Sequence, residues 1–241
     1  MIRQPLYYQN RPADIPQWLW LYFPPLMLLL LGVTYLVFPE IFTLLMAKDG
    51  LQARWALVEH ATVAVLLPGI VAGLLLVTKH HHTLPNQYIR LWFLSWTLAC
   101  IYFAGEEISW GQWLFHWQSP EWFINHNEQH ETNLHNISSW LNQKPRALVE
   151  LWITWACCIV PLYHLVTGKQ PEASNWRYWC YASKVCLPAA FCFLLLRIGK
   201  SIDIALIQDF TVSSELREYY VALVLSVYLL SAYRRAGNQR I

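Results

Sequence analysis

Charged residues are scarce in this chain. Asp, Glu, Lys and Arg make up 13% of its 241 residues, whereas they make up roughly a quarter of a soluble domain. Residues 18–38 and 151–168 contain none of the four, and each stretch is long enough to cross the hydrocarbon core of a bilayer. With 56% hydrophobic residues overall, the chain is predicted to be an integral membrane protein and not a soluble domain.

Several common site types are also missing. The formal net charge is only +2 and the basic residues stand singly between apolar runs, so there is no nucleic-acid-binding footprint. No GxSxG motif, phosphate-binding P-loop or dinucleotide fingerprint occurs. The six cysteines fall in or beside apolar runs, where cysteine behaves as a small hydrophobe. Their spacing predicts neither a disulfide framework nor a zinc motif.

The apolar runs predict an all-α, polytopic transmembrane bundle that forms a single membrane domain. About six transmembrane helices are expected, and the third and sixth are the least cleanly apolar: 18–38, 56–78, 91–113, 149–168, 178–197 and 216–233. The connection 114–148 is too polar to span. Within it, Ser119, Pro120 and Glu121 predict the start of a short interfacial helix, with Ser119 as its N-cap.

The distribution of Lys and Arg between the short loops predicts the orientation. The loops on the side of the two termini carry the larger share of these residues, which favours cytoplasmic termini and an extracytoplasmic 114–148 connection.

Ionisable groups cluster at the predicted helix ends. They would share one side of the membrane if the helices alternate in direction: Glu59 and His60 in the second segment, Glu106 and Glu107 in the third, Glu150 in the fourth, Glu215 and Glu218 in the sixth. A charge at the bilayer centre costs roughly 2–3 kcal/mol unless it is paired or faces water. The cluster indicates a shared polar cavity, although each carboxylate could simply mark the point where its helix leaves the lipid.

The block 105–112 (GEEISWGQ) is the most informative of these ends. Glu106 and Ser109 would share a helical face, while Gly105 and Gly111 would permit close approach of another helix. Two adjacent carboxylates in a low dielectric favour a shared proton, a metal or a basic partner.

Histidines and acids alternate in residues 125–136 (NHNEQHETNLHN). His126 and His130, like Glu131 and His135, are four residues apart, so a helix would present two pairs of metal ligands. Such a set suits zinc or iron with an open position that activates water. The alternative is that these side chains only line a polar site.

The blocks GEEISWGQ (105–112) and ETNLHN (131–136), with Val58 and Glu59, resemble a largely uncharacterised family of bacterial polytopic membrane proteins. The resemblance implies a bacterial cytoplasmic (inner) membrane location. The family pattern matches Glu106, Glu107, Ser109, Gln112, Glu131, Asn133, His135 and Asn136, but not His126 or His130. It therefore favours Glu106, Glu107, Glu131 and His135 as the core of a site and supplies no reaction.

The leading hypothesis is a membrane-embedded enzyme whose extracytoplasmic site hydrolyses or transfers a lipid or lipid-linked substrate. Glu106 or Glu107 would be base or ligand, and Glu131 with His135 would be ligand or acid. A divalent metal such as zinc would be held by Glu107, Glu131 and His135. The substrate would be lined by Ser109, Gln112, Asn133, Asn136, Glu59, His60 and Trp110.

Two other classes stay open. A proton- or cation-coupled transporter would need acidic or histidine groups deeper in the membrane, where the sequence offers only His164 and Lys184. A structural or docking subunit of an envelope assembly would use the tryptophans of the connection as anchors for lipid, a protein partner or a second copy.

Overall fold

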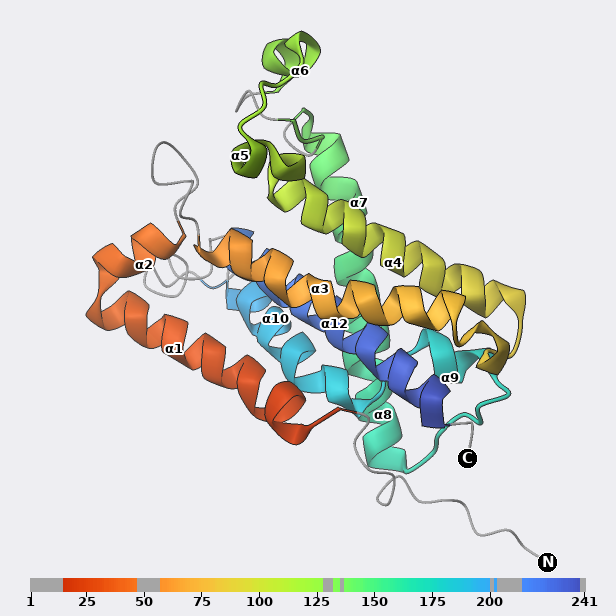
Figure 1. Ribbon diagram of the computed structural model, residues 1–241. Helices are drawn as coiled ribbons and strands as arrows, with labels where there is room; N and C mark the ends of the chain where they lie inside the picture. The colour runs from red at the N-terminus through yellow and green to blue at the C-terminus, as the bar shows by residue number, and fades with distance from the viewer. Residues whose placement is uncertain are drawn as a thin grey trace, which may run out of the picture.

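The computed structural model describes residues 15–46, 57–127, 132–134, 137–199, 202 and 214–238. Every regular element in these residues is a helix, and none is a strand (Figure 1). The predicted all-α class is therefore confirmed for the described part of the chain.

Most of the long helices follow the apolar runs of the sequence, but α7 (Ser139–Trp152) begins within the connection 114–148 that was predicted to be too polar to span. The long helices are α1 (Phe23–Val37), α3 (Leu57–Thr78), α4 (Gln87–Glu107), α7 (Ser139–Trp152), α8 (Val160–Thr167), α10 (Leu187–Gly199) and α12 (Ser214–Gly237). Wider π-helical turns at Trp18–Tyr22 and Ile153–Ile159 lead into α1 and join α7 to α8. The shorter helices are α2 (Pro39–Leu45), α5 (Gln112–Phe115), α6 (Glu121–His126) and α9 (Trp176–Cys180).

Four helical stretches are long and apolar enough to cross a membrane: Trp18–Val37, Leu57–Thr78, Gln143–Thr167 and Trp176–Gly199. The last of these is interrupted between α9 and α10, where Tyr181 and Ser183 are extended. Much of their apolar surface faces outward, as a lipid-facing surface does. On α1, for example, Leu29 and Leu36 are more than 60% exposed. Helix α12 contains the sixth predicted segment, and α4 contains the third segment up to Glu107, six residues before its predicted end. Neither helix meets this criterion, so a count of six is not established.

Helix α12 forms the centre of the bundle and is buried along most of its length. It packs against α3 through a close approach at Gly69, where an added Cβ would lie 2.6 Å from the Cα of Ser226. Helix α3 meets α4 in the same way, because a Cβ on Gly73 would lie 2.2 Å from Oγ1 of Thr97. Small residues thus bring three helices together where larger side chains would hold them apart.

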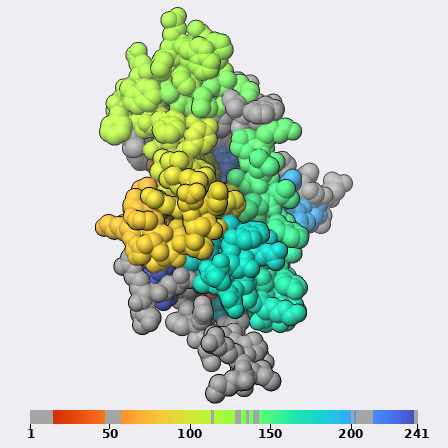
Figure 2. All heavy atoms as spheres, turned by 90° about the vertical axis from the view of Figure 1, so that its right-hand side faces the viewer, coloured from red at the N-terminus to blue at the C-terminus, as the bar shows by residue number. Residues whose placement is uncertain are grey.

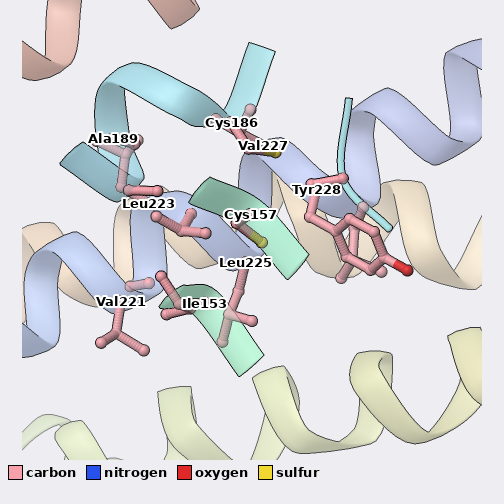
Figure 3. Close-up of a cluster of buried hydrophobic side chains, with 14 of the residues drawn as sticks. Ile153, Cys157, Cys186, Ala189, Val221, Leu223, Leu225, Val227 and Tyr228 are labelled. Carbon is pink, nitrogen blue, oxygen red and sulfur yellow. The ribbon is translucent and has the colours of Figure 1, made fainter. Parts of the chain in front are cut away.

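The apolar core lies between α12, α10 and the π-helical turn that joins α7 to α8. Figure 3 shows Ile153 and Cys157 of the turn beside Ala189 of α10 and the α12 side chains. Tyr228 adds a polar joint, since its hydroxyl donates to the Trp179 carbonyl at 2.8 Å and accepts from Nε1 of Trp92 at 2.8 Å. All six cysteines are free, in agreement with the predicted lack of a disulfide framework.

The polar connection lies beyond one end of the bundle. Helices α5 and α6 project past the end of α4 in two perpendicular views (Figures 1 and 2). The predicted short helix is present as α6, but Ser119 is not its N-cap. Pro120 occupies the cap position without a side-chain hydrogen bond, because the Ser119 hydroxyl donates instead to Oε1 of Gln112 at 3.1 Å.

Candidate functional site

The chain reverses sharply where α4 ends. Ser109, Trp110 and Gly111 follow the helix with φ angles of 45°, 53° and 84°, a left-handed stretch that non-glycine residues adopt rarely. The reversal folds the Trp110 indole back over Gly105, where an added Cβ would lie 2.8 Å from the ring. Gly105 therefore makes room for this side chain, and its predicted role in the approach of another helix is wrong.

Glu106 joins the two sequence blocks. It is 4% exposed; its Oε1 accepts from Nε1 of Trp110 at 2.8 Å, and its Oε2 accepts from the backbone N–H of Leu134 at 2.7 Å. Both carboxylate oxygens thus hold the connection against the end of α4. This arrangement favours a positioning role for Glu106 over that of a general base.

The predicted substrate-lining amides also hold the connection against the end of α4. Gln112 accepts from the backbone N–H of Thr132 at 2.9 Å. Asn133 donates to the hydroxyl of Ser109 at 3.2 Å, and its own carbonyl accepts from Asn127 at 2.9 Å. Asn133 and Ser109 are almost fully buried, so these side chains organise the connection from within.

Half of the histidine-rich stretch can be compared with the predicted ligand helix. Helix α6 ends at His126, Asn127 is extended, and residues 132–134 are not helical. His130, Glu131, His135 and Asn136 lie outside the described residues, and their roles as ligands or acids stay predictions.

Three carboxylates meet near the end of α4. Glu107 at the end of α4 and Glu215 and Glu218 in the first turns of α12 each offer an oxygen, and these oxygens lie within 4.8 Å of one another. Glu215 is 5% exposed, and the other two are half-buried. We call these three residues the carboxylate cluster. Its members come from the helix ends that the sequence predicted to share one side.

Basic side chains from two more helices border the carboxylate cluster. Arg146 of α7 contacts Glu218 at 2.6 Å and Glu150 at 3.1 Å, and Arg197 of α10 contacts Glu150 at 3.1 Å. We call these four residues the ion-pair chain. The ends of α4, α10 and α12 and the middle and last turns of α7 therefore meet in one charged region.

Glu59 and His60 lie in the first turn of α3. Helices α3 and α4 form an antiparallel hairpin, so this turn is at the same end of the bundle as Glu107. Glu59 is half-buried and His60 is exposed. Trp110, the remaining predicted lining residue, is 47% exposed where the connection meets the end of α4.

The carboxylate cluster is chemically suited to a cation or a shared proton. Three carboxylates this close repel one another in a low dielectric unless positive charge lies between them. An all-oxygen donor set matches hard cations such as Mg²⁺, Mn²⁺ or Ca²⁺ better than zinc. The predicted zinc site depends on His135, so it cannot be built from the described residues alone.

Sequence reasoning named Glu107 as a site residue and expected Glu215 and Glu218 to share a polar cavity with it. It gave those two acids no role in the reaction and did not place Arg146 or Arg197 near the site. The pair Glu215 and Glu218 carried a usable signal, because acids three residues apart lie on one face of a helix. Arg146 and Arg197 had no such signal in the sequence, because a single basic residue near the end of an apolar run is common in membrane proteins.

No protein-family model, curated protein or solved structure matches the chain. The resemblance to the bacterial membrane family stays a prediction, and the geometry of the charged region carries the functional argument.

Proposed function

We propose that this chain is a membrane-embedded enzyme that hydrolyses or transfers a lipid or lipid-linked substrate at the charged region beside α4 and α12. The observation that carries the proposal is the meeting of Glu107, Glu215 and Glu218 within 4.8 Å. Buried, convergent carboxylates provide the acid, the base or the metal ligands for such a reaction.

The proposed roles of the residues differ from those in the sequence hypothesis. Glu107 keeps its role as base or ligand, now with Glu215 and Glu218 as its partners. Glu106 positions the connection that covers the region, through Trp110 and Leu134. A hard divalent cation held by the cluster would polarise the substrate or activate a water molecule.

The proposal includes a six-helix topology in a bacterial cytoplasmic membrane, with cytoplasmic termini. Helices α4 and α12 have 21 and 24 residues, which is enough to span a bilayer. The sides of α12 are covered by neighbouring helices, so its charged ends need not face lipid. This accounts for its modest hydropathy. With cytoplasmic termini and six spans, the charged region would lie on the extracytoplasmic side.

A transporter has less support from the interior of the bundle. In the described residues, the buried polar side chains between its two ends are hydroxyls: Thr62, Thr97, Ser226 and Ser231. Thr62 and Thr97 donate to carbonyls four residues earlier in their own helices. His164 and Lys184 are half-buried and do not extend the carboxylate cluster into a path.

A docking role keeps one supporting observation. The projecting connection exposes large apolar side chains, with Phe115 79% and Trp122 53% exposed. These side chains suit contact with lipid headgroups, a protein partner or a second copy.

The test combines metal binding with lipid turnover. We expect purified protein in proteoliposomes of total bacterial lipid to bind Mn²⁺ tightly, as measured by electron paramagnetic resonance, and to convert a lipid detected by mass spectrometry. Glu107→Gln, Glu215→Gln and Glu218→Gln should each weaken Mn²⁺ binding and lower turnover by roughly 100-fold or more.

The matched control is Glu172→Gln, which changes an exposed acid outside the charged region and should leave both measurements unchanged. Cation or proton flux that depends on Glu107, without any lipid conversion, would overturn the enzyme in favour of the transporter. Folded cluster variants with unchanged turnover would remove the cluster from the reaction.

A further inference from the structure

Arg217 occupies a buried position in the first turns of α12. It is 8% exposed, and its Nε has no hydrogen-bond partner among the described residues. The ion-pair chain involves Arg146 and Arg197 but not Arg217. A buried guanidinium in this condition is costly, because an unmet charged donor loses its hydration without compensation.

The other buried arginine of the described residues makes more contacts than Arg217, although its Nη2 also has no hydrogen-bond partner there. Arg235, near the opposite end of α12, donates to the carbonyls of Tyr178 and Ser231. Its guanidinium also lies 5.0 Å from the ring centre of Tyr178. Arg217 shows no comparable set of contacts, so its burial calls for another explanation.

Arg217 lies next to the ion-pair chain. The charges that act on its guanidinium are those of Arg146, Glu150, Glu218 and Arg197. Glu150 and Glu218 thus face three guanidinium groups, while Glu107 and Glu215 add two more carboxylates on the far side of Glu218. Arg146 also has a buried nitrogen, Nη2, with no hydrogen-bond partner in the described part of the chain. Two neighbouring arginines therefore present donors that lack an acceptor.

An anion with several oxygen atoms would satisfy these donors together. Phosphate is the best match, because guanidinium groups bind its oxygens in paired hydrogen bonds. The carboxylate cluster would repel a phosphate when empty. A hard cation in the cluster reverses that effect, since such ions commonly bridge carboxylates and substrate phosphates. The carboxylate cluster thus suits the cation, and the arginines suit the phosphate, of one cation–phosphate ligand.

We propose that Arg217 and Arg146 bind the phosphate of a lipid, so that the substrate of the enzyme is a lipid phosphate ester or diphosphate. The inference rests on the proposed function for its reaction, while the phosphate site itself can be tested by binding alone. Arg217 would contact the phosphate directly, and Glu218 would link the arginines to the cation held by the cluster.

The experiment measures binding to protein in a non-ionic, phosphate-free detergent. The probes are dioctanoyl phosphatidic acid, dioctanoylglycerol and inorganic phosphate, each with and without Mn²⁺, and the readout is tryptophan fluorescence. We expect phosphatidic acid to bind, more tightly with Mn²⁺, and dioctanoylglycerol not to bind. Arg217→Gln should weaken phosphatidic acid binding by roughly 10- to 100-fold.

The matched control is Arg234→Gln, an exposed arginine in the last turn of the same helix, which should bind as the parent does. Inorganic phosphate that binds as tightly as phosphatidic acid would overturn the assignment to a lipid. Equal binding of phosphatidic acid and dioctanoylglycerol would overturn the phosphate site.

A second variant separates a binding arginine from a structural one. Arg217→Met removes the buried charge and keeps the apolar stem, so the ligand-free protein should unfold at a higher temperature while phosphatidic acid binding is lost. A lower unfolding temperature with unchanged binding would show that Arg217 is structural and overturn the proposal. If Arg217→Gln abolishes binding but no lipid turnover exists in the parent, the site stands and the proposed enzyme falls.

Discussion

Replacement of Glu106 by alanine is expected to release the polar connection from the end of α4. The substitution removes the acceptor for the Trp110 indole at 2.8 Å and for the Leu134 backbone N–H at 2.7 Å. Hydrogen bonds to a charged group contribute roughly 1.5–3 kcal/mol each, so the free energy of unfolding should fall by about 3 kcal/mol or more. Thermal unfolding in detergent measures the loss of stability.

Limited proteolysis gives the local readout, since a released connection should be cut faster near residues 115–127 than in the parent protein. The control is Glu121→Ala, which removes an exposed acid from α6 in the same connection and should change neither measurement. Glu106→Gln keeps one oxygen acceptor and should lie between the two. An alanine variant with parental stability and cleavage would show that Glu106 does not hold the connection.

Replacement of Arg146 by alanine should have a comparable effect for a different reason. Its side chain is 22% exposed and bridges Glu150 on its own helix and Glu218 on α12. Removal leaves both carboxylates beside Glu107 and Glu215 without this neighbouring positive charge. Breaking such a buried ion pair costs roughly 3–5 kcal/mol; allowing for the partial exposure, we expect a loss of about 2–3 kcal/mol in chemical unfolding experiments.

Added Mn²⁺ should recover part of the stability of Arg146→Ala, because a cation in the cluster replaces some of the missing positive charge. The exposed Arg177, at the start of α9, supplies the control substitution Arg177→Ala. A loss no larger than in that control would mean that Arg146 does not neutralise the cluster.

Hydropathy was sufficient to predict the helices, because a long apolar run has few alternatives to a buried or lipid-facing helix. It was insufficient for the role of α12, whose Glu215, Arg217 and Arg235 lower its hydropathy although the helix is the most enclosed in the bundle. Burial among other helices depends on their arrangement in space, which a local window of sequence does not contain.

The contacts between distant blocks were partly predictable. Acids at several helix ends predicted a shared polar cavity under an alternating topology, and Glu107 does lie beside Glu215 and Glu218 of α12. The same reasoning could not tell a carboxylate that accepts structural hydrogen bonds, such as Glu106, from one that meets other carboxylates, such as Glu107. Glu106 and Glu107 are adjacent in the sequence, and their side chains leave α4 in different directions.

Local side-chain hydrogen bonds explain why α6 ends at His126. Asparagines and other short polar side chains compete for backbone hydrogen bonds and often end helices. Asn127 follows α6, and its side-chain amide donates to Asn133. The ligand pairs with His130, Glu131 and His135 lie outside the described residues and stay predictions.

The meeting of α4 and α12 at the carboxylate cluster is the central claim, and a disulfide cross-link tests it most directly. The double variant Glu107→Cys/Glu218→Cys should form a disulfide on mild oxidation in membranes, detected by peptide mapping, while Glu121→Cys/Glu218→Cys should not. Failure of the first pair to cross-link, in protein that is folded and inserted, would show that the two helix ends do not meet and would remove the proposed site.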